Sequence, residues 1–289
     1  MAAVVEIFTK IEIVMQNFTY HTHNNELHFD GHHSAEEMIA AAEAKGFAEI
    51  GVSNHLICHK NLSNMPNYEP MFFCDFKTAE AACQRHIEII RAAAEKHKIK
   101  VRIGFEVDFF PSAYWRNNFE KMRKNLDVDY LIGSTHFLYA DNESFLCNLY
   151  HIKHYPDLPS RPEFQEYLRN YWRNIAAAVE SGYFTFMAHL DYCAIFNLCT
   201  TPEWDNSKNM VIETLAKYRQ PYELNTSGYN RINRPHPEKQ MLIELNKHNV
   251  PVLLSDDSHD VATLGQHFER AEKLLSDIGY INRFNPFKV

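Results

Sequence analysis

Glycine is scarce in this chain, at 9 of 289 residues, and no G-x-G-x-x-G sequence occurs. Open α/β sheets that bind dinucleotides usually carry that glycine-rich turn after their first strand. The chain also has no C-x-x-C pair, and its 6 cysteines show no regular spacing. A disulfide framework is therefore not indicated, and reduced, buried thiols in a cytoplasmic protein are expected.

The chain has no block of Lys or Arg, and 29 Lys+Arg against 37 Asp+Glu leave a formal net charge of −8. Proteins that hold nucleic acid by its phosphate backbone need positive charge, so a small substrate is expected instead of a nucleic acid. Charged residues interrupt the apolar stretch Met1 to Gln16, which is typical of neither a signal peptide nor a membrane span. Residues 1–14 are expected to be an extension that adds little to the fold.

Short runs rich in β-branched and aromatic residues alternate with longer segments of helical periodicity, which is typical of a parallel sheet covered by helices. The predicted strands are Asn17 to His23, Ala48 to Ser53, Val101 to Val107, Tyr130 to Ser134, Tyr183 to Ala188, Pro221 to Asn225 and Val250 to Leu254. The predicted helices are Ala35 to Lys45, Asp75 to His97, Ser112 to Lys124, Arg161 to Ser181, Asn206 to Arg219, Pro235 to His248 and Thr263 to Ile278.

No linker or break in composition divides the chain, so residues 1–289 are predicted to form a single domain. Seven βα units can close into a barrel or form an open sheet, and the missing glycine-rich turn favours the barrel. Two connections are long, Leu56 to Cys74 and Tyr139 to Ser160. Connections of that length without secondary structure are usually functional, so we expect them to form walls or lids of the site.

Histidine is unusually frequent, at 17 of 289 residues, and histidines or carboxylates follow the predicted strands. In chain order these positions are His21 and His23, His55, Glu106 and Asp108, His136, His189 and Asp191, Glu223, and Asp257 and His259. Because the carboxyl ends of barrel strands meet at one face, these side chains are expected to converge there. They are also the residue types that bind transition metals.

Residues two apart in a strand point to the same side. His21 with His23, and Asp257 with His259, could therefore each reach one cluster, and the same spacing selects Asp257 over Asp256. Taken singly, each residue has a simpler explanation, such as a polar rim residue or a helix N-cap at Asp257. Taken together, so many ionisable groups would be costly to bury without a cation, so a metal site is predicted.

Eight segments carry a more specific signal. They are Tyr20-His21-Thr-His23, Phe29-Asp30-Gly31, Val52-Ser-Asn-His55, Gly104-Phe-Glu106, Asp129-Tyr-Leu-Ile-Gly-Ser-Thr-His136-Phe, Met187-Ala-His189, Glu223-Leu-Asn-Thr-Ser-Gly228 and Ser255-Asp-Asp257-Ser-His259. In this order the chain resembles the polymerase and histidinol phosphatase (PHP) family, in particular its histidinol-phosphatase branch, from Asn17 to Ile278. The resemblance implies a distorted (β/α)7 TIM-like barrel with a trinuclear metal centre at the C-terminal ends of the strands.

The metal ligands that the resemblance implies are His21, His23, Asp30, His55, Glu106, His136, His189, Asp257 and His259. The stretch from His23 to Asp30 is longer than is usual in the family, so His28 and His32 are alternatives to Asp30. Where the family usually has Thr-Asp-His, this chain has Ser53-Asn54-His55, which keeps the histidine but changes its neighbour.

Mixed imidazole and carboxylate ligands suit zinc, iron or manganese, and two to three such divalent cations are expected. Paired cations activate water and stabilise an in-line phosphoryl displacement, so hydrolysis of a phosphomonoester is predicted. Asp257 or His189 could protonate the leaving alcohol. In the histidinol-phosphatase branch, an Arg after the Asn-Thr-Ser-Gly run is implicated in phosphate binding, which corresponds to Arg231; Arg234 and Arg161 are further candidates.

Histidinol phosphate is the expected substrate, converted to histidinol for histidine synthesis. The alternatives are another phosphorylated metabolite, such as a nucleotide or a sugar phosphate, and a non-catalytic metal-stabilised module. Histidinol carries an amine, which should meet a carboxylate in the pocket. The sequence offers Glu223, Asp108, Asp191, Asp141, Glu143 and Asp157 for that role. Neither nucleic acid nor a membrane is expected as a partner, and the sequence does not indicate an oligomeric state.

Overall fold

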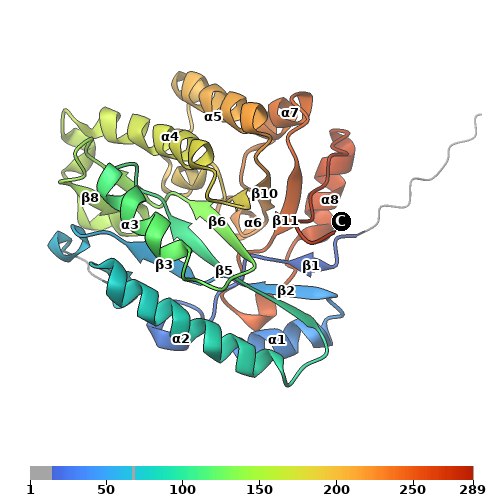
Figure 1. Ribbon diagram of the computed structural model, residues 1–289. Coiled ribbons are helices and arrows are strands. Elements are labelled where there is room, and N and C mark those ends of the chain that lie inside the picture. The colour runs from blue at the N-terminus through green and yellow to red at the C-terminus, as the bar shows by residue number, and fades with distance from the viewer. Residues whose placement is uncertain (1–14, 67–68, 289) are drawn as a thin grey trace, which may run out of the picture.

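Seven parallel strands, neighbours in the order of the chain, form the centre of the fold (Figure 1). The computed structural model describes residues 15–66 and 69–288, so the predicted extension 1–14 lies outside the described residues. The strands are β1 (Phe18–Thr19), β2 (Glu49–Val52), β5 (Lys100–Asp108), β6 (Tyr130–Ser134), β9 (Phe186–Met187), β10 (Tyr222–Asn225) and β11 (Val252–Ser255). Each overlaps a predicted strand.

The first and last strands meet just beyond their ends. Thr22 forms a parallel bridge with Ser258, and the backbone N–H of His23 donates to the Ser258 carbonyl over 2.8 Å. The sheet is therefore a nearly closed barrel, which confirms the predicted fold class.

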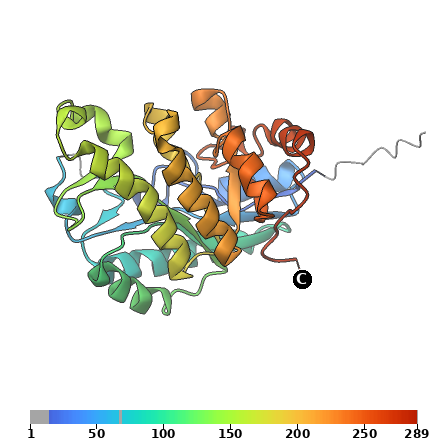
Figure 2. The same cartoon turned by 90° about the horizontal axis from the view of Figure 1, so that it is seen from above.

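Helices cover the outside of the barrel, and Figure 2 shows several of them side by side along one flank. They are α1 (Ala35–Ala44), α2 (Phe76–Ala94), α3 (Ala113–Arg123), α4 (Phe164–Ser181), α5 (Asp205–Tyr218), α6 (Gly228–Ile232), α7 (Lys239–Lys247) and α8 (Phe268–Asp277). The short α6 was not predicted, and the other helices overlap the predicted ones. Gly182 ends α4 with φ 66°, a left-handed conformation that suits glycine.

The two long connections are not unstructured, contrary to the prediction. The first contains β3 (His55–Cys58), which pairs in parallel with both β5 and β4 (Phe72–Phe73). The second follows β7 (Phe137–Tyr139) and contains β8 (Leu146–Asn148), which pairs with β7 in the antiparallel direction. These strands are too short to show periodicity in the sequence, and their stability comes from pairing with distant segments.

The interior of the barrel is filled with apolar side chains near the end at which the strands begin. Its buried residues are Phe18, Tyr20, Tyr130, Ile132, Phe186, Ala188 and Leu253, with Phe284 and Phe287 packed against them. Tyr130 crosses this interior and donates its hydroxyl to the Tyr20 carbonyl over 2.6 Å. Gly104 faces the Tyr130 ring so closely that a Cβ atom would lie 2.6 Å from it. Because this half is closed by apolar packing, the polar groups gather at the other end.

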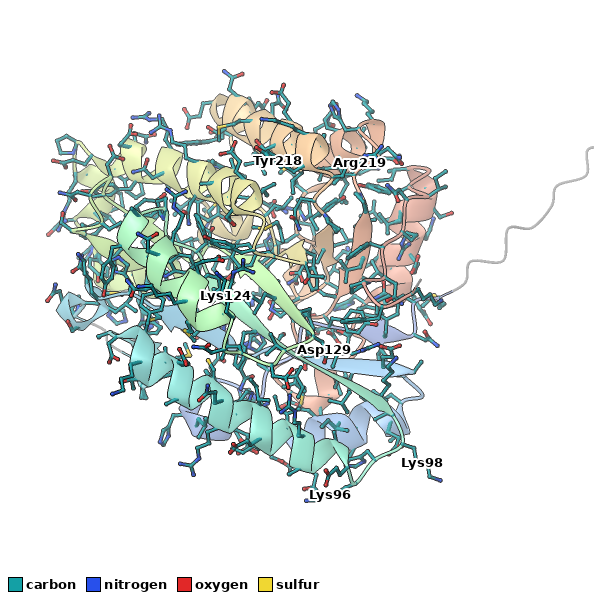
Figure 3. All side chains as sticks on the ribbon, viewed as in Figure 1. Lys96, Lys98, Lys124, Asp129, Tyr218 and Arg219 are labelled. Carbon is teal, nitrogen blue, oxygen red and sulfur yellow. The ribbon has the colours of Figure 1, made fainter. Side chains whose placement is uncertain are left out.

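The labelled residues of Figure 3 mark the end of the barrel at which strands begin. They are Lys96, Lys98, Lys124, Asp129, Tyr218 and Arg219, and all lie at or next to a helix-to-strand connection. In the part of the chain that the structure describes, no helix has the length and apolarity needed to cross a bilayer.

Candidate metal centre

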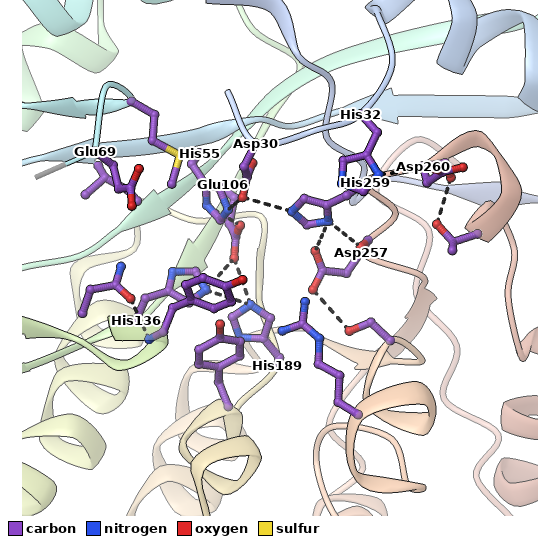
Figure 4. A pocket seen from close by; sticks show the side chains of 18 of the residues that line it. Asp30, His32, His55, Glu69, Glu106, His136, His189, Asp257, His259 and Asp260 are labelled. Carbon is purple, nitrogen blue, oxygen red and sulfur yellow. Dashed lines mark hydrogen bonds and ion pairs between the residues drawn. The ribbon is translucent and has the colours of Figure 1, made fainter. Parts of the chain in front are cut away.

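All nine predicted ligands come together at the C-terminal ends of the strands. Seven of them line a cavity of about 470 Å³ and are labelled in Figure 4: Asp30, His55, Glu106, His136, His189, Asp257 and His259. The ligand atoms of all nine form four overlapping groups, in each of which the atoms lie within 4.8 Å of one another. The groups are His23, Asp30, His55 and His259; His21, Glu106 and His189; His21, His23 and Asp257; and His55, Glu106 and His136. We call these nine residues the strand-end cluster.

Glu106 stands at the centre of the cluster, fully buried near the end of β5. Its Oε1 lies 3.0 Å from Nε2 of His189 and 3.4 Å from Nε2 of His136. Its Oε2 lies 2.9 Å from Nδ1 of His55 and 3.2 Å from Nε2 of His21. Burial alone would raise the pKa of Glu106, but the surrounding imidazoles lower it well below its usual range. The carboxylate is therefore an anion with both oxygens directed at imidazole nitrogens.

The position of Asp30 favours it over His28 and His32 as a ligand of the cluster. Its Oδ2 lies 3.3 Å from Nε2 of His259 and 3.4 Å from Nε2 of His55. Burial would raise the pKa of Asp30, but these two imidazoles hold it below its usual range. His28 is exposed, and His32, 68% exposed at its side chain, pairs with a carboxylate outside the cluster.

Asp257 reaches the cluster for a different reason from the one predicted. β11 ends before it, and Asp257 adopts a left-handed backbone with φ 48°, so a turn and not strand alternation places it with His259. Its Oδ1 lies 3.2 Å from Nε2 of His23 and 3.4 Å from Nε2 of His21. Asp256 instead hydrogen-bonds to the first strand and to the loop that follows. The choice of Asp257 is supported, and the period-two argument for it is wrong.

Two carboxylates outside the cluster each hold the Nδ1 atom of one cluster histidine and so orient its ring. Nδ1 of His21 donates to Oε2 of Glu223 over 2.8 Å, and Nδ1 of His136 donates to Oδ2 of Asp108 over 2.9 Å. Metal-bound histidines commonly donate their second N–H in this way, which directs the other nitrogen at the metal. Glu223 and Asp108, two of the six candidates for accepting a substrate amine, are instead engaged with histidines of the cluster.

The donor atoms of the cluster fit divalent metal ions. Among the described residues, Nε2 of His21, both ring nitrogens of His23 and Oε2 of Glu106 are buried without a hydrogen-bond partner. Burial lowers the pKa of His23 to about 3, with smaller contributions from neighbouring histidines, so its ring is the neutral form that binds metals. Nε2 of His136 lies only 3.2 Å from Nε2 of His189. Cations between these atoms would satisfy groups that otherwise carry a desolvation cost.

Arg231 lines the cavity, as predicted, from the short helix α6. Its guanidinium lies close to the Tyr192 phenol, whose pKa it lowers against the larger effect of burial. The Tyr192 ring in turn lies 4.8 Å, between centroids, from the rings of both His136 and His189. Tyr192 thus lies between the cluster and Arg231. The sequence analysis missed it because nothing in the sequence distinguishes it from other aromatic residues.

The two other predicted arginines do not line the cavity. Asn233 ends α6 with φ 55°, so Arg234 turns away and pairs with Asp191, with Nη1 2.8 Å from Oδ2. Asp191, another candidate for accepting the amine, is therefore engaged as well. Arg161 lies over the ring of Phe145, at 5.6 Å from its centroid. Phosphate binding by Arg234 or Arg161 stays a prediction, which this geometry does not support.

The PHP domain family model matches residues 19–248 of this chain. The chain belongs to the PHP domain family. This finding confirms the resemblance that the eight sequence segments indicated.

Two curated relatives of this PHP-domain chain are named as histidinol-phosphatases. A probable histidinol-phosphatase of Deinococcus radiodurans is 27% identical over 187 residues, which cover 63% of this chain and 66% of that protein. The histidinol-phosphatase of Bacillus subtilis is 21% identical over 275 residues, covering 88% of this chain and 98% of that protein.

Two crystal structures share the fold of this PHP domain. The putative histidinol phosphatase of Listeria monocytogenes aligns with a TM-score of 0.67 and 18% identity, covering 88% of this chain and 99% of that one. The histidinol phosphate phosphatase of Lactococcus lactis, complexed with zinc, L-histidinol and phosphate, aligns with a TM-score of 0.65 and 18% identity, covering 93% and 95%.

Another wall of the cavity of this PHP domain is built by the two long connections. Its lining residues are Ile57, Glu69, Met71, Asn148, Tyr150 and His151, which we call the loop wall. Glu69 and His151 form an ion pair, with Oε1 2.9 Å from Nε2. The acidic residues predicted to face the substrate from the second connection are absent from the lining, and Glu143 is buried against His59. The sequence therefore identified the connection but not the residues.

Proposed function

We propose that this chain is a metal-dependent phosphomonoesterase that converts histidinol phosphate and water to histidinol and phosphate. The observation that carries the proposal is the strand-end cluster, which faces a 470 Å³ cavity together with Arg231. A cavity of this volume suits a small molecule. The names of the relatives support this substrate, as does the Lactococcus lactis structure, which holds zinc, L-histidinol and phosphate.

The strand-end cluster is proposed to hold two to three divalent cations, with zinc, iron and manganese as the candidates. Glu106 belongs to two of the four ligand groups, so its carboxylate would be shared between cations. Bound divalent cations would supply a nucleophile derived from water near neutral pH and would neutralise charge on the phosphoryl group.

Arg231 is proposed to bind the phosphate. A guanidinium can donate two parallel hydrogen bonds to phosphate oxygens, and this one lines the cavity together with Tyr192. Asp257 and His189, which both line the cavity, stay the two candidates for protonating the leaving oxygen. The Asp257 carboxylate also contacts the Asn225 amide over 3.2 Å, a contact that holds it at the edge of the cluster.

Steady-state kinetics on a panel of phosphorylated metabolites tests the proposal. For histidinol phosphate, kcat/KM should exceed that for nucleoside monophosphates and sugar phosphates by at least about a hundredfold, which polar contacts in a dedicated pocket can supply. A flat profile, or a preference for a nucleotide, would indicate a different phosphorylated substrate. No hydrolysis by metal-loaded protein would favour the non-catalytic alternative.

A further inference from the structure

Among the described residues, five carboxylates line the cavity, and they are engaged to different degrees. Asp30, Glu106 and Asp257 belong to the strand-end cluster. Asp260 accepts the backbone N–H of residue 262 over 2.8 Å and also pairs with a histidine. Glu69 differs, because His151 is the one polar partner of its side chain across residues 15–66 and 69–288.

We propose that Glu69 binds the ammonium group of the substrate's leaving alcohol and so determines specificity for amine-bearing phosphomonoesters. The inference rests on the proposed phosphatase function. Glu69 contacts His151 through Oε1, which leaves Oε2 able to accept a hydrogen bond from an ammonium. Its side chain is 37% exposed, so a ligand can reach it from the cavity.

The placement of charge around the cavity supports this role. Arg231 supplies a cation beside Tyr192 and the strand-end cluster. Glu69 supplies an anion on the loop wall, away from Asp257 and His259 (Figure 4). A substrate with a phosphate at one end and an ammonium nearer the other is complementary to this arrangement.

The surroundings of Glu69 suit an amine carried on a partly apolar body. Ile57 and Met71 line the cavity next to it along the same connection, and Tyr150 lines it from the second connection with a side chain that is 61% exposed. Apolar lining with one well-placed charge is typical of small-molecule sites. The loop wall therefore offers a surface for carbon atoms and a single anion for the amine.

The backbone holds Glu69 in place before any substrate binds. Its carbonyl accepts the N–H of Phe72 over 2.9 Å, which starts the strand β4. β4 pairs with β3, and β3 pairs with β5 opposite Glu106. Through these pairings the position of Glu69 is tied to the strand that carries the centre of the cluster, and a preorganised contact costs less to form.

The test compares two substrates that differ only in the amine: histidinol phosphate and 3-(imidazol-4-yl)propyl phosphate. In the Glu69→Gln protein, kcat/KM for histidinol phosphate should fall at least about tenfold, mostly through KM, because the contact forms in ground state and transition state alike. For the amine-free ester it should change less than about twofold. Asp157→Asn is the matched control, since Asp157 lies in the second long connection but outside the cavity lining, and it should leave both values unchanged.

An equal loss for both substrates, or no loss for either, would overturn the role of Glu69. Failure of the proposed function is distinguishable, because it would appear in the unaltered protein as no preference for histidinol phosphate over nucleotides and sugar phosphates. In that case ethanolamine phosphate and ethyl phosphate replace the first pair. A loss of kcat/KM in the Glu69→Gln protein for ethanolamine phosphate alone would still support the role of Glu69. An equal loss for both esters would reject it.

Discussion

The strand-end cluster and the loop wall face one cavity, but their side chains are positioned by different means. Most residues of the cluster lie at or just beyond the ends of barrel strands, whose parallel pairing sets neighbours directly, as where Glu106 of β5 lies opposite Ile132 of β6. Residues of the loop wall depend on short strands such as β4 and β8, which exist only through pairing with other parts of the chain. The difference separates the chemistry, built on the barrel, from substrate choice, built on the connections.

The largest expected effect comes from the centre of the strand-end cluster. Glu106→Gln removes the charge that two ligand groups share, so kcat/KM should fall at least about a thousandfold, equivalent to roughly 4 kcal/mol. Metal content, measured by elemental analysis, should fall with it. Glu95→Gln, an exposed substitution on the outside of the barrel, is the control. A Glu106→Gln protein with full metal content and activity within tenfold of the original would contradict the assignment.

The packing behind the cluster makes a prediction about pH. His86 is buried between Phe29 and Phe105, neighbours of two cluster residues, and burial lowers its pKa to about 4. The unfolded chain takes up a proton near pH 6.5, whereas the folded protein does not until about pH 4. The unfolded state therefore binds more protons in this window, and stability is lost as the pH falls through it.

The size of this loss is on the order of 3 kcal/mol for His86 alone. Denaturant unfolding at several pH values should show a steeper decline for the original protein than for His86→Leu between pH 6.5 and 4. Parallel declines would mean that His86 is protonated or hydrated in the folded protein.

The third prediction concerns phosphate binding by Arg231, which lines the cavity together with residues of both regions. Arg231→Ala should lower kcat/KM about a hundredfold, and Arg231→Lys should recover only part of it, because an ammonium cannot form the two-point contact. Arg161→Ala serves as the control, since Arg161 lies outside the cavity lining, and should stay within twofold. If Arg231→Ala also stayed within twofold, the phosphate would have to be held by other groups.

A smaller effect is expected where the two long connections join behind the loop wall. Glu143 accepts from Nε2 of His59 and from the backbone N–H of Ser112, each over 2.8 Å, and its carbonyl accepts from the Asn61 amide. Glu143→Gln should lower the free energy of unfolding by about 2 kcal/mol, the worth of a hydrogen bond to a charged group. In kinetics KM for histidinol phosphate should rise while kcat changes little. A fall in kcat with unchanged KM would show that this contact supports the cluster instead.

The sequence predicted the strand-end cluster well because its signals are local. A strand of hydrophobic residues ending in histidine or glutamate is visible in a short window, and the barrel brings all such ends to one face. Asp257 does lie in the cluster, as predicted, although its left-handed turn was not anticipated. The sequence pattern indicated Asp257 but not the backbone conformation that places it in the cluster.

The loop wall could not be predicted in the same way. β3 and β4 are held by pairing between segments that the sequence does not mark as strands, so Glu69 carried no signal of its own. The different positions of the Arg231 and Arg234 side chains could not be predicted either. A single left-handed residue between them, Asn233, directs Arg234 towards Asp191. Side-chain direction outside regular elements depends on such turns, which short-range patterns do not specify.

The most direct test of the central claim is a metal titration of the chelator-treated protein with histidinol phosphate as substrate. Zinc, manganese and ferrous iron are added separately, and bound metal and initial rate are measured on the same samples. The account predicts that activity is lost on chelation and returns only as two or more equivalents bind, with no return in the Glu106→Gln protein. Full hydrolysis with less than one equivalent of bound metal would contradict it.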